Sequence, residues 1–198
     1  NPETLVGVGP AFPRLGQELG YFEVFSPAEY RDILQQSRTL EKIVAWDMGN
    51  RQISTSEGST NVFTSFWWGD ALEALGMVPA AGRGFLPEET DRGDRVAIIS
   101  HRLWQELYGG DPEAMGSALQ VNREPYTLVG VLPEGTNIYG SDLWTPMPVG
   151  PEAYPRNRRQ FQVLARIAPG FTLGEVNAEL EGIAGRVESA YGSEFEEY

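Results

Sequence analysis

The chain has 198 residues, a hydrophobic content of 41% and five tryptophans, values typical of an ordered globular protein of one or two domains. Its 28 acidic and 15 basic residues give a formal net charge of −13, so its surface repels phosphate backbones and nucleic acid is not an expected partner. The lack of cysteine excludes disulfides, thiolate catalysis and zinc sites built on cysteine.

The first predicted helix begins after Ser26, with Pro27 at its first position and Glu29 completing a capping box. Apolar residues then recur near helical spacing as far as Val44, which predicts one buried face. These apolar residues are Tyr30, Ile33, Leu34, Leu40, Ile43 and Val44.

Two further helices are predicted in the second half of the chain. Ser100 caps a short one, whose apolar stripe (Leu103, Trp104, Leu107 and Tyr108) ends at Gly109-Gly110. Thr172 and Glu175 form a second capping box, and a long apolar face follows it. That face consists of Leu173, Val176, Leu180, Ile183, Ala184 and Val187.

Strands are predicted around these helices. The residues from Phe161 to Ile167 alternate apolar with polar, as in a half-buried strand, and Asn122 to Pro125 indicate a hairpin turn. The other candidate strands are residues 5–8, 52–56, 62–68, 95–99, 119–121 and 126–132.

Proline and glycine gather in two seams, at residues 79–94 and 133–155, which we interpret as two crossings between subdomains. The predicted fold is α+β. Residues 1–92 and 143–198 are expected to form a larger α/β subdomain of strand-helix-strand units, and residues 93–142 a small inserted α/β subdomain. We expect the strands at residues 5–8 and 160–167 to share one sheet of the larger subdomain, which would also bring the two ends of the chain together.

The run from Phe66 to Pro133 carries several motifs in a recognisable order. A short helix ending in Leu75-Gly76 precedes Gly82-Arg83-Gly84-Phe85, and Arg95 to Ser100 lead into the Leu103-Trp104 helix. Gly109 to Pro112, Leu119 to Asn122 and Tyr126 to Pro133 complete it. This order resembles the periplasmic core domain of MacB-like ABC-transporter permeases, a branch of the FtsX-like superfamily, and in particular the duplicated orphan permeases.

The resemblance implies a porter-like subdomain with a small Sabre-like insert, and a non-catalytic role on the extracytoplasmic side of a bacterial inner membrane. It implies that the chain begins just after the first membrane helix and stops before the segment that would re-enter the membrane. The implied partners are the membrane helices of the permease, a cytoplasmic ABC ATPase subunit, and a periplasmic adaptor or second permease protomer. The implied action is to transmit ATP-driven motion, with no catalytic, cofactor-binding or metal-binding residue. Consistent with this, the sequence lacks a phosphate-binding loop ending in Lys-Ser or Lys-Thr.

Four groups of residues are weighed as possible sites. His101 follows Ser100, but neighbours in sequence do not make a nucleophile and base, and a surface histidine is favoured. Glu88, Glu89, Asp91 and Asp94 could hold calcium, although they lack the spacing of an EF-hand loop, so a solvated acidic loop is favoured.

The remaining two groups are basic and aromatic. Arg156, Arg158 and Arg159 could face anionic lipid or an acidic partner, but pairing with the chain's own carboxylates is favoured. Core packing is favoured for a set of aromatic residues that could also contact a sugar, a lipid or a partner. These are Phe66, Trp67, Trp68, Tyr139, Trp144 and Tyr154.

Two alternative functions stay open on the sequence. One is an extracellular carbohydrate- or peptide-binding module, and the other is a hydrolase with paired carboxylates, which requires two acids at a fixed separation.

Overall fold

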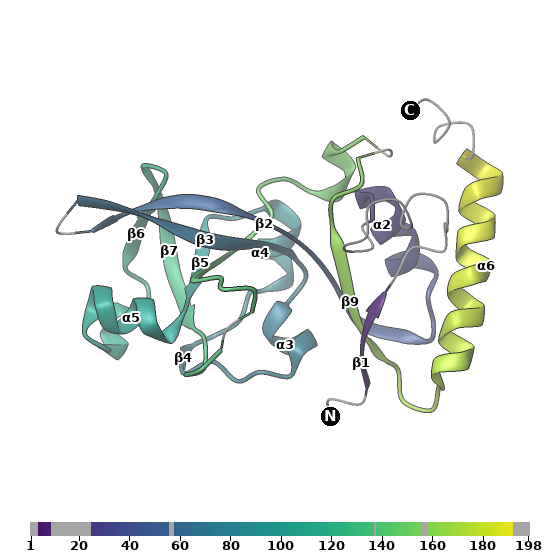
Figure 1. The fold of residues 1–198 in the computed structure, drawn as a ribbon, viewed down its shortest axis with the longest axis horizontal. Helices are drawn as coiled ribbons and strands as arrows, with labels where there is room; N and C mark the ends of the chain where they lie inside the picture. The colour runs from purple at the N-terminus through teal and green to yellow at the C-terminus, as the bar shows by residue number, and fades with distance from the viewer. Residues whose placement is uncertain (1–3, 9–24, 56–57, 137, 156–157, 192–198) are drawn as a thin grey trace. The chain divides into compact units, whose positions relative to one another are not determined.

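A computed structural model describes residues 4–8, 25–55, 58–136, 138–155 and 158–191. The chain divides into two compact units. Unit 1 comprises residues 1–45 and 151–198, and unit 2 comprises residues 46–150. Both contain helices and strands, in agreement with the α+β class (Figure 1).

The sheet of unit 1 begins with β1 (Leu5–Val8), which pairs antiparallel with β9 (Gln162–Ile167). The register places Val6 opposite Ala165 and Val8 opposite Val163. These four residues share one face, because side chains alternate along a strand. Next in the sheet order is β2 (Leu40–Thr55), which belongs to unit 1 as far as Ala45. The prediction that residues 5–8 and 160–167 share a sheet is confirmed.

Helix α2 (Pro27–Gln36) begins as predicted but ends earlier. The Ser26 hydroxyl accepts a hydrogen bond from the backbone N–H of Glu29 at 3.2 Å, and the Glu29 carboxylate accepts one from the N–H of Ser26 at 2.8 Å. The prediction that this helix continues to Val44 was wrong, because Ser37 adopts an extended conformation and Leu40 begins β2. The β-branched residues in this stretch suit a sheet, and Leu34 is half exposed.

Helix α6 (Leu173–Tyr191) confirms the second capping box, with Thr172 and Glu175 bonded to each other's backbone N–H. Its buried residues are Val176, Ile183 and Val187, whereas Leu173 is 55% exposed against the expectation that it is buried.

The described ends of unit 1 lie far apart. Because β1 is antiparallel to β9, and α6 returns after β9, β1 and α6 begin at the same end of the unit (Figure 1). Nineteen helical residues then extend about 28 Å away from that end. The expectation that the larger subdomain brings the chain ends together does not hold for Leu5 and Tyr191.

Unit 2 is built on a mixed sheet. Strand β3 (Gly58–Trp68) pairs in parallel with β8 (Leu143–Pro146), which in turn pairs antiparallel with β5 (Val96–Ile99). Strand β7 (Glu124–Val131) lies parallel to β5 and antiparallel to β6 (Ala118–Val121) and to β4 (Ala81–Gly82). The hairpin turn between β6 and β7 is at Asn122-Arg123, both with positive φ, as the sequence indicated.

Helix α5 (His101–Tyr108) packs on this sheet with Leu103 and Trp104 buried, as predicted. Unit 2 also contains the short helices α3 (Ala71–Leu75), α4 (Pro87–Arg92) and η2 (Pro112–Ala114), while η3 (Pro151–Ala153) lies in unit 1. Strand β8 was not predicted from the sequence, and the stretch that forms α4 was expected to be a solvated acidic loop with Glu88 and Glu89 near a helix or turn start.

The boundaries of the units differ from the predicted insert at 93–142. The second boundary, after Gly150, falls inside the predicted seam at 133–155. The first lies within β2, at Ala45, because β3 pairs with β8 over Thr64 to Trp67 and so belongs to the same unit as β5 and β7. Assignment of the units to porter-like and Sabre-like subdomains stays a prediction.

Candidate functional site: polar clusters and a surface hollow

A carboxylate from α6 holds together the corner between α2 and β2 in unit 1. The Glu179 side chain accepts hydrogen bonds from the hydroxyl groups of Ser37 at 2.7 Å and Thr39 at 2.6 Å. It also accepts bonds from the backbone N–H groups of Arg38 and Thr39 at 2.9 and 3.0 Å. We call this set of bonds the Glu179 clamp. The clamp connects α6 to the three residues between the end of α2 and the start of β2.

The clamp changes the acidity of Glu179. Burial by itself raises the pKa of this carboxyl, but the hydrogen bonds from Thr39, Ser37 and the backbone favour the charged form and lower the pKa from 4.5 to about 2. Glu179 is thus a fixed anion. Sequence reasoning missed it, because its partners lie about 140 residues away in the chain.

The serine beside His101 serves as a helix cap. Its hydroxyl donates to the Asp142 carboxylate at 2.6 Å and accepts from the backbone N–H of Leu103 at 3.1 Å. The His101 ring instead meets the edge of Trp104, with centroids 5.4 Å apart. Because Ser100 bonds Asp142 and not His101, the geometry supports the structural interpretation of this pair.

The acidic stretch at residues 88–94 forms α4 and its end. Glu89 is buried, accepts from the N–H of Leu86 at 2.9 Å and pairs with both terminal nitrogens of Arg83, at 2.7 and 2.8 Å. The hydrogen bond from Arg83 holds the pKa of the Glu89 carboxyl below its usual value. Asp94 pairs with Arg92 at 2.7 Å. Two of the four acids are therefore engaged by arginines. Within the described ranges, no group of three or more His, Cys, Asp or Glu residues is placed to hold a metal ion.

The aromatic residues of β3 point to both faces of the sheet of unit 2. Trp67 packs between Trp46 and Trp144, with centroids 5.3 and 5.0 Å away, and all three are at most 3% exposed. On the other face, the indole N–H of Trp68 donates to the carbonyl of Val149 at 3.0 Å. Buried rings cannot stack on a sugar, so the core interpretation is supported.

The two remaining aromatics lie nearer the surface. Tyr139 is half exposed and stacks on Trp46. Tyr154, in unit 1, meets Phe161 edge-on.

The basic cluster is partly taken up by unit 1 itself. Arg159 pairs with Glu29, and both side chains are largely buried. Arg158 lies over the ring of Tyr154 at 5.1 Å and donates to Gln160 at 2.6 Å. Arg156 lies outside the described residues. For Arg159, the ion pair with Glu29 agrees with the interpretation favoured from the sequence, in which these arginines pair with the chain's own carboxylates.

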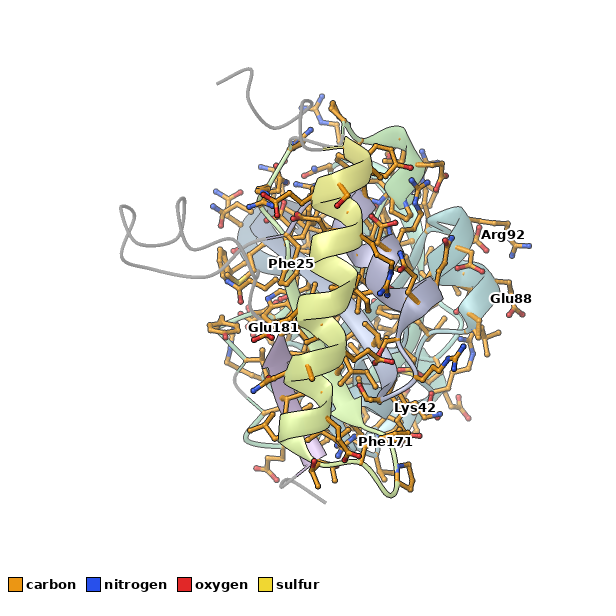
Figure 2. All side chains as sticks on the ribbon, turned by 90° about the vertical axis from the view of Figure 1, so that its right-hand side faces the viewer. Phe25, Lys42, Glu88, Arg92, Phe171 and Glu181 are labelled. Carbon is orange, nitrogen blue, oxygen red and sulfur yellow. The ribbon has the colours of Figure 1, made fainter. Side chains whose placement is uncertain are left out.

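A surface hollow of about 150 Å³ lies between β1 and α6 in unit 1. Val6, Gly7 and Val8 line it from the strand, and the lining residues of α6 include Val176, Leu180 and Glu181. Figure 2 shows Glu181 on the side of α6 that faces β1, with Phe171 near the start of the helix. Sequence reasoning did not find this hollow, since it arises from two segments about 170 residues apart.

No helix in the described part of the chain combines the length and the apolar character needed to cross a membrane.

The family model described as the MacB-like periplasmic core domain matches residues 2–183. The chain therefore belongs to the family of MacB-like periplasmic core domains, as the order of motifs from Phe66 to Pro133 predicted.

Solved structures agree with this assignment at the level of the fold. The periplasmic region of MacB from Actinobacillus actinomycetemcomitans matches with a TM-score of 0.68 and 10% identity, over 95% of this chain and 83% of that one. The extracellular domain of the noncanonic ABC-type transporter YknZ from Gram-positive bacteria matches with a TM-score of 0.67 and 15% identity, over 95% of both chains.

Curated relatives match over shorter segments. The macrolide export ATP-binding/permease protein MacB of Burkholderia thailandensis is 27% identical over 79 residues, which cover 38% of this chain. A probable export ATP-binding/permease protein of Pseudomonas fluorescens is 25% identical over 95 residues, or 46% of the chain. The matches span 12% and 15% of the length of these relatives.

Proposed function

We propose that this chain is the extracytoplasmic domain of an ABC-type permease, on the outer side of a bacterial inner membrane, and that it transmits motion without performing a reaction. The observation that carries the proposal is the family match over residues 2–183. The curated relatives named as ATP-binding/permease proteins support it.

The Glu179 clamp gives this role a physical basis. A helix can pass on a displacement only if it is fixed to the element that it moves. Five hydrogen bonds from the corner of α2 and β2 reach one charged carboxylate on α6, and bonds to a charged group are stronger than neutral ones. A pull on α6 is therefore passed directly to the sheet of unit 1.

Ser100, beside His101, and two buried carboxylates have structural roles that support a non-enzymatic function. Ser100 caps α5, Glu89 pairs with Arg83, and Glu29 pairs with Arg159. A glycosidase needs two carboxylates across its cleft, whereas among the described residues that line the hollow beside β1 only Glu181 carries a carboxylate.

The partners in this proposal are the membrane helices of the same permease, a cytoplasmic ATPase subunit, and an adaptor or a second permease protomer outside the membrane. The ATPase would supply the energy. The two units described here would carry the resulting movement to the partner.

The test uses the full-length permease with its ATPase in proteoliposomes. The described chain has no cysteine, so single cysteines at the exposed positions Leu34 or Glu188 can be cross-linked between protomers with a bismaleimide of defined length. We expect the cross-linked permease to hydrolyse ATP but to lose most of its transport, while the same variants without cross-linker keep both activities. Normal transport after cross-linking, or hydrolysis of a glycan or peptide by the isolated chain, would contradict the proposal.

A further inference from the structure

The outer edge of β1 is open to pairing in the part of the chain that the structure describes. β1 stands first in the sheet order and its four residues pair only with β9 there. An edge strand presents unpaired N–H and C=O groups, and proteins commonly protect such an edge with charge, proline or a bulge. The segment Leu5-Val6-Gly7-Val8 has neither charge nor proline. A methyl group added at Gly7 would meet no atom within 4 Å, so the face of the strand is open at that residue.

The hollow beside this edge, of about 150 Å³, has room for small apolar side chains of a strand whose backbone lies along β1. Four strand residues span about 13 Å, and the helical stretch from Leu173 to Glu181 spans about 12 Å. Val6 to Val8 and several residues between Leu173 and Glu181 line the hollow, and the two stretches run in the same direction. Leu173 is 55% exposed and Leu180 half buried, so α6 offers an apolar wall beside the open edge.

The carboxylate of Glu181, at the edge of the hollow, favours a basic residue in the bound segment. Glu181 is exposed, and within the described ranges its carboxylate makes no hydrogen bond or ion pair. Because α6 runs in the same direction as β1, Glu181 lies toward the Val8 end of the strand (Figure 2). A lysine or arginine at that end of an added strand would meet an unneutralised carboxylate.

A second copy of the chain fits this edge poorly. Its own β1 has no basic residue, and two chains of net charge −13 repel each other where both present acidic helices. We propose that the β1 edge and the hollow beside it bind an extended segment of a partner protein, with alternating small apolar side chains and a basic residue beside Glu181. The added strand would pair with the backbone of β1, its apolar side chains would fill the hollow, and its cation would fix the register. This site does not depend on the transmission of motion proposed above.

The test is an NMR titration of the 198-residue chain with two peptides, acetyl-Lys-Val-Thr-Val-Thr-amide and the same peptide with Glu in place of Lys. We expect the basic peptide to shift the backbone signals of β1 and of the first half of α6, and to bind about threefold to tenfold more tightly than the acidic one. A proline at the third peptide position removes a strand donor and should weaken binding by a similar factor.

Matched variants separate the site from general electrostatics. Glu181→Lys should reverse the preference between the two peptides, whereas Glu188→Lys, an exposed carboxylate on the same helix outside the hollow, should leave it unchanged. Leu173→Asp should weaken both peptides, and Leu34→Asp, a similarly exposed leucine on α2, should not.

Absence of shifts at millimolar peptide, or equal effects of Glu181→Lys and Glu188→Lys, would overturn the proposal. So would a dimer in sedimentation that Leu173→Asp abolishes, since the occupant would then be a second copy. Transport in the full-length permease is a separate readout, so failure of this site and failure of the proposed function can be told apart.

Discussion

At the scale of single residues, Glu179 has the largest assigned role, because one carboxylate satisfies both the hydroxyl and the backbone groups of a chain corner. The backbone N–H groups of Arg38 and Thr39 follow the end of α2 and need acceptors, and here the acceptor is a carboxylate on another helix. Glu89 has a comparable role in unit 2, where it caps α4 and pairs with Arg83.

We expect Glu179→Gln to lower the free energy of unfolding by about 1–3 kcal/mol at pH 7, because the amide cannot supply a charged acceptor to the four donor groups of Ser37, Arg38 and Thr39. Urea denaturation followed by far-UV circular dichroism measures this loss. Glu181→Gln removes a carboxylate two residues away and should change stability by less than about 0.5 kcal/mol. Equal effects of the two substitutions would contradict the role of the clamp.

The same residue predicts a loss of stability in acid. The folded-state pKa of Glu179 is about 2 against an ordinary 4.5, so the unfolded chain binds a proton at this site first as the pH falls. The stabilisation is fully present above about pH 4.5 and is lost between pH 4.5 and 2. Urea midpoints measured at several pH values should fall more steeply for the wild type than for Glu179→Gln. Parallel curves would show that Glu179 is not responsible.

At the scale of elements, a glycine is required where another backbone segment lies too close to leave room for a Cβ atom. A Cβ atom at Gly130 in β7 would lie 2.2 Å from the carbonyl oxygen of Arg83, which follows β4. At Gly185, on the exposed side of α6, an added Cβ meets nothing within 4 Å.

The same substitution should therefore have opposite effects at these two positions. Gly130→Ala forces β7 and the Arg83 segment apart and should cost about 1–3 kcal/mol. Gly185→Ala should stabilise the protein by about 0.5–1 kcal/mol, because alanine favours the helix. Thermal melting of both variants tests the pair, and a stable Gly130→Ala would show that the contact gives way easily.

Trp104 anchors α5 on the sheet of unit 2. It is 8% exposed, belongs to the cluster with Leu103 and Leu128, and its indole N–H donates to the carbonyl of Asp111 at 3.0 Å. Trp104→Ala should cost about 3–5 kcal/mol and lower the melting temperature. His101→Ala, one turn away and only in edge contact, serves as the control and should cost less than about 1 kcal/mol. An unchanged melting temperature for Trp104→Ala would contradict burial.

At the scale of the whole molecule, the two units each have a core of their own. All five tryptophans, at positions 46, 67, 68, 104 and 144, belong to unit 2. The core of unit 1 contains Phe25, Ile33, Phe161, Val176 and Ile183 instead.

Tryptophan fluorescence therefore reports on unit 2 alone, whereas circular dichroism reports on both units. We expect Glu179→Gln, in unit 1, to lower the urea midpoint seen by circular dichroism more than the midpoint seen by fluorescence, because separate cores can open as separate cooperative units. Trp104→Ala should lower the midpoint seen by the fluorescence of the four remaining tryptophans, which all belong to unit 2. Coincident shifts by both methods for Glu179→Gln would show that the chain unfolds as one unit.

The sequence by itself determined what depends on neighbours along the chain. The capping boxes at Ser26 and Thr172, the cap at Ser100, the hairpin turn at Asn122 and the alternation before Ile167 each depend on a few adjacent residues, and each is present. The family followed from the order of such motifs.

Only the tertiary structure decided what depends on distant partners. Residues 40–44 have helical spacing but form a strand, because pairing with neighbouring strands outweighs a weak local preference. The first boundary of the units lies within β2, after Ala45, outside both proline- and glycine-rich seams, since the pairing of β3 with β8 decides which segments belong together. The Glu179 clamp and the hollow beside β1 likewise join segments more than 130 residues apart, and no local pattern in the sequence encodes such a distance.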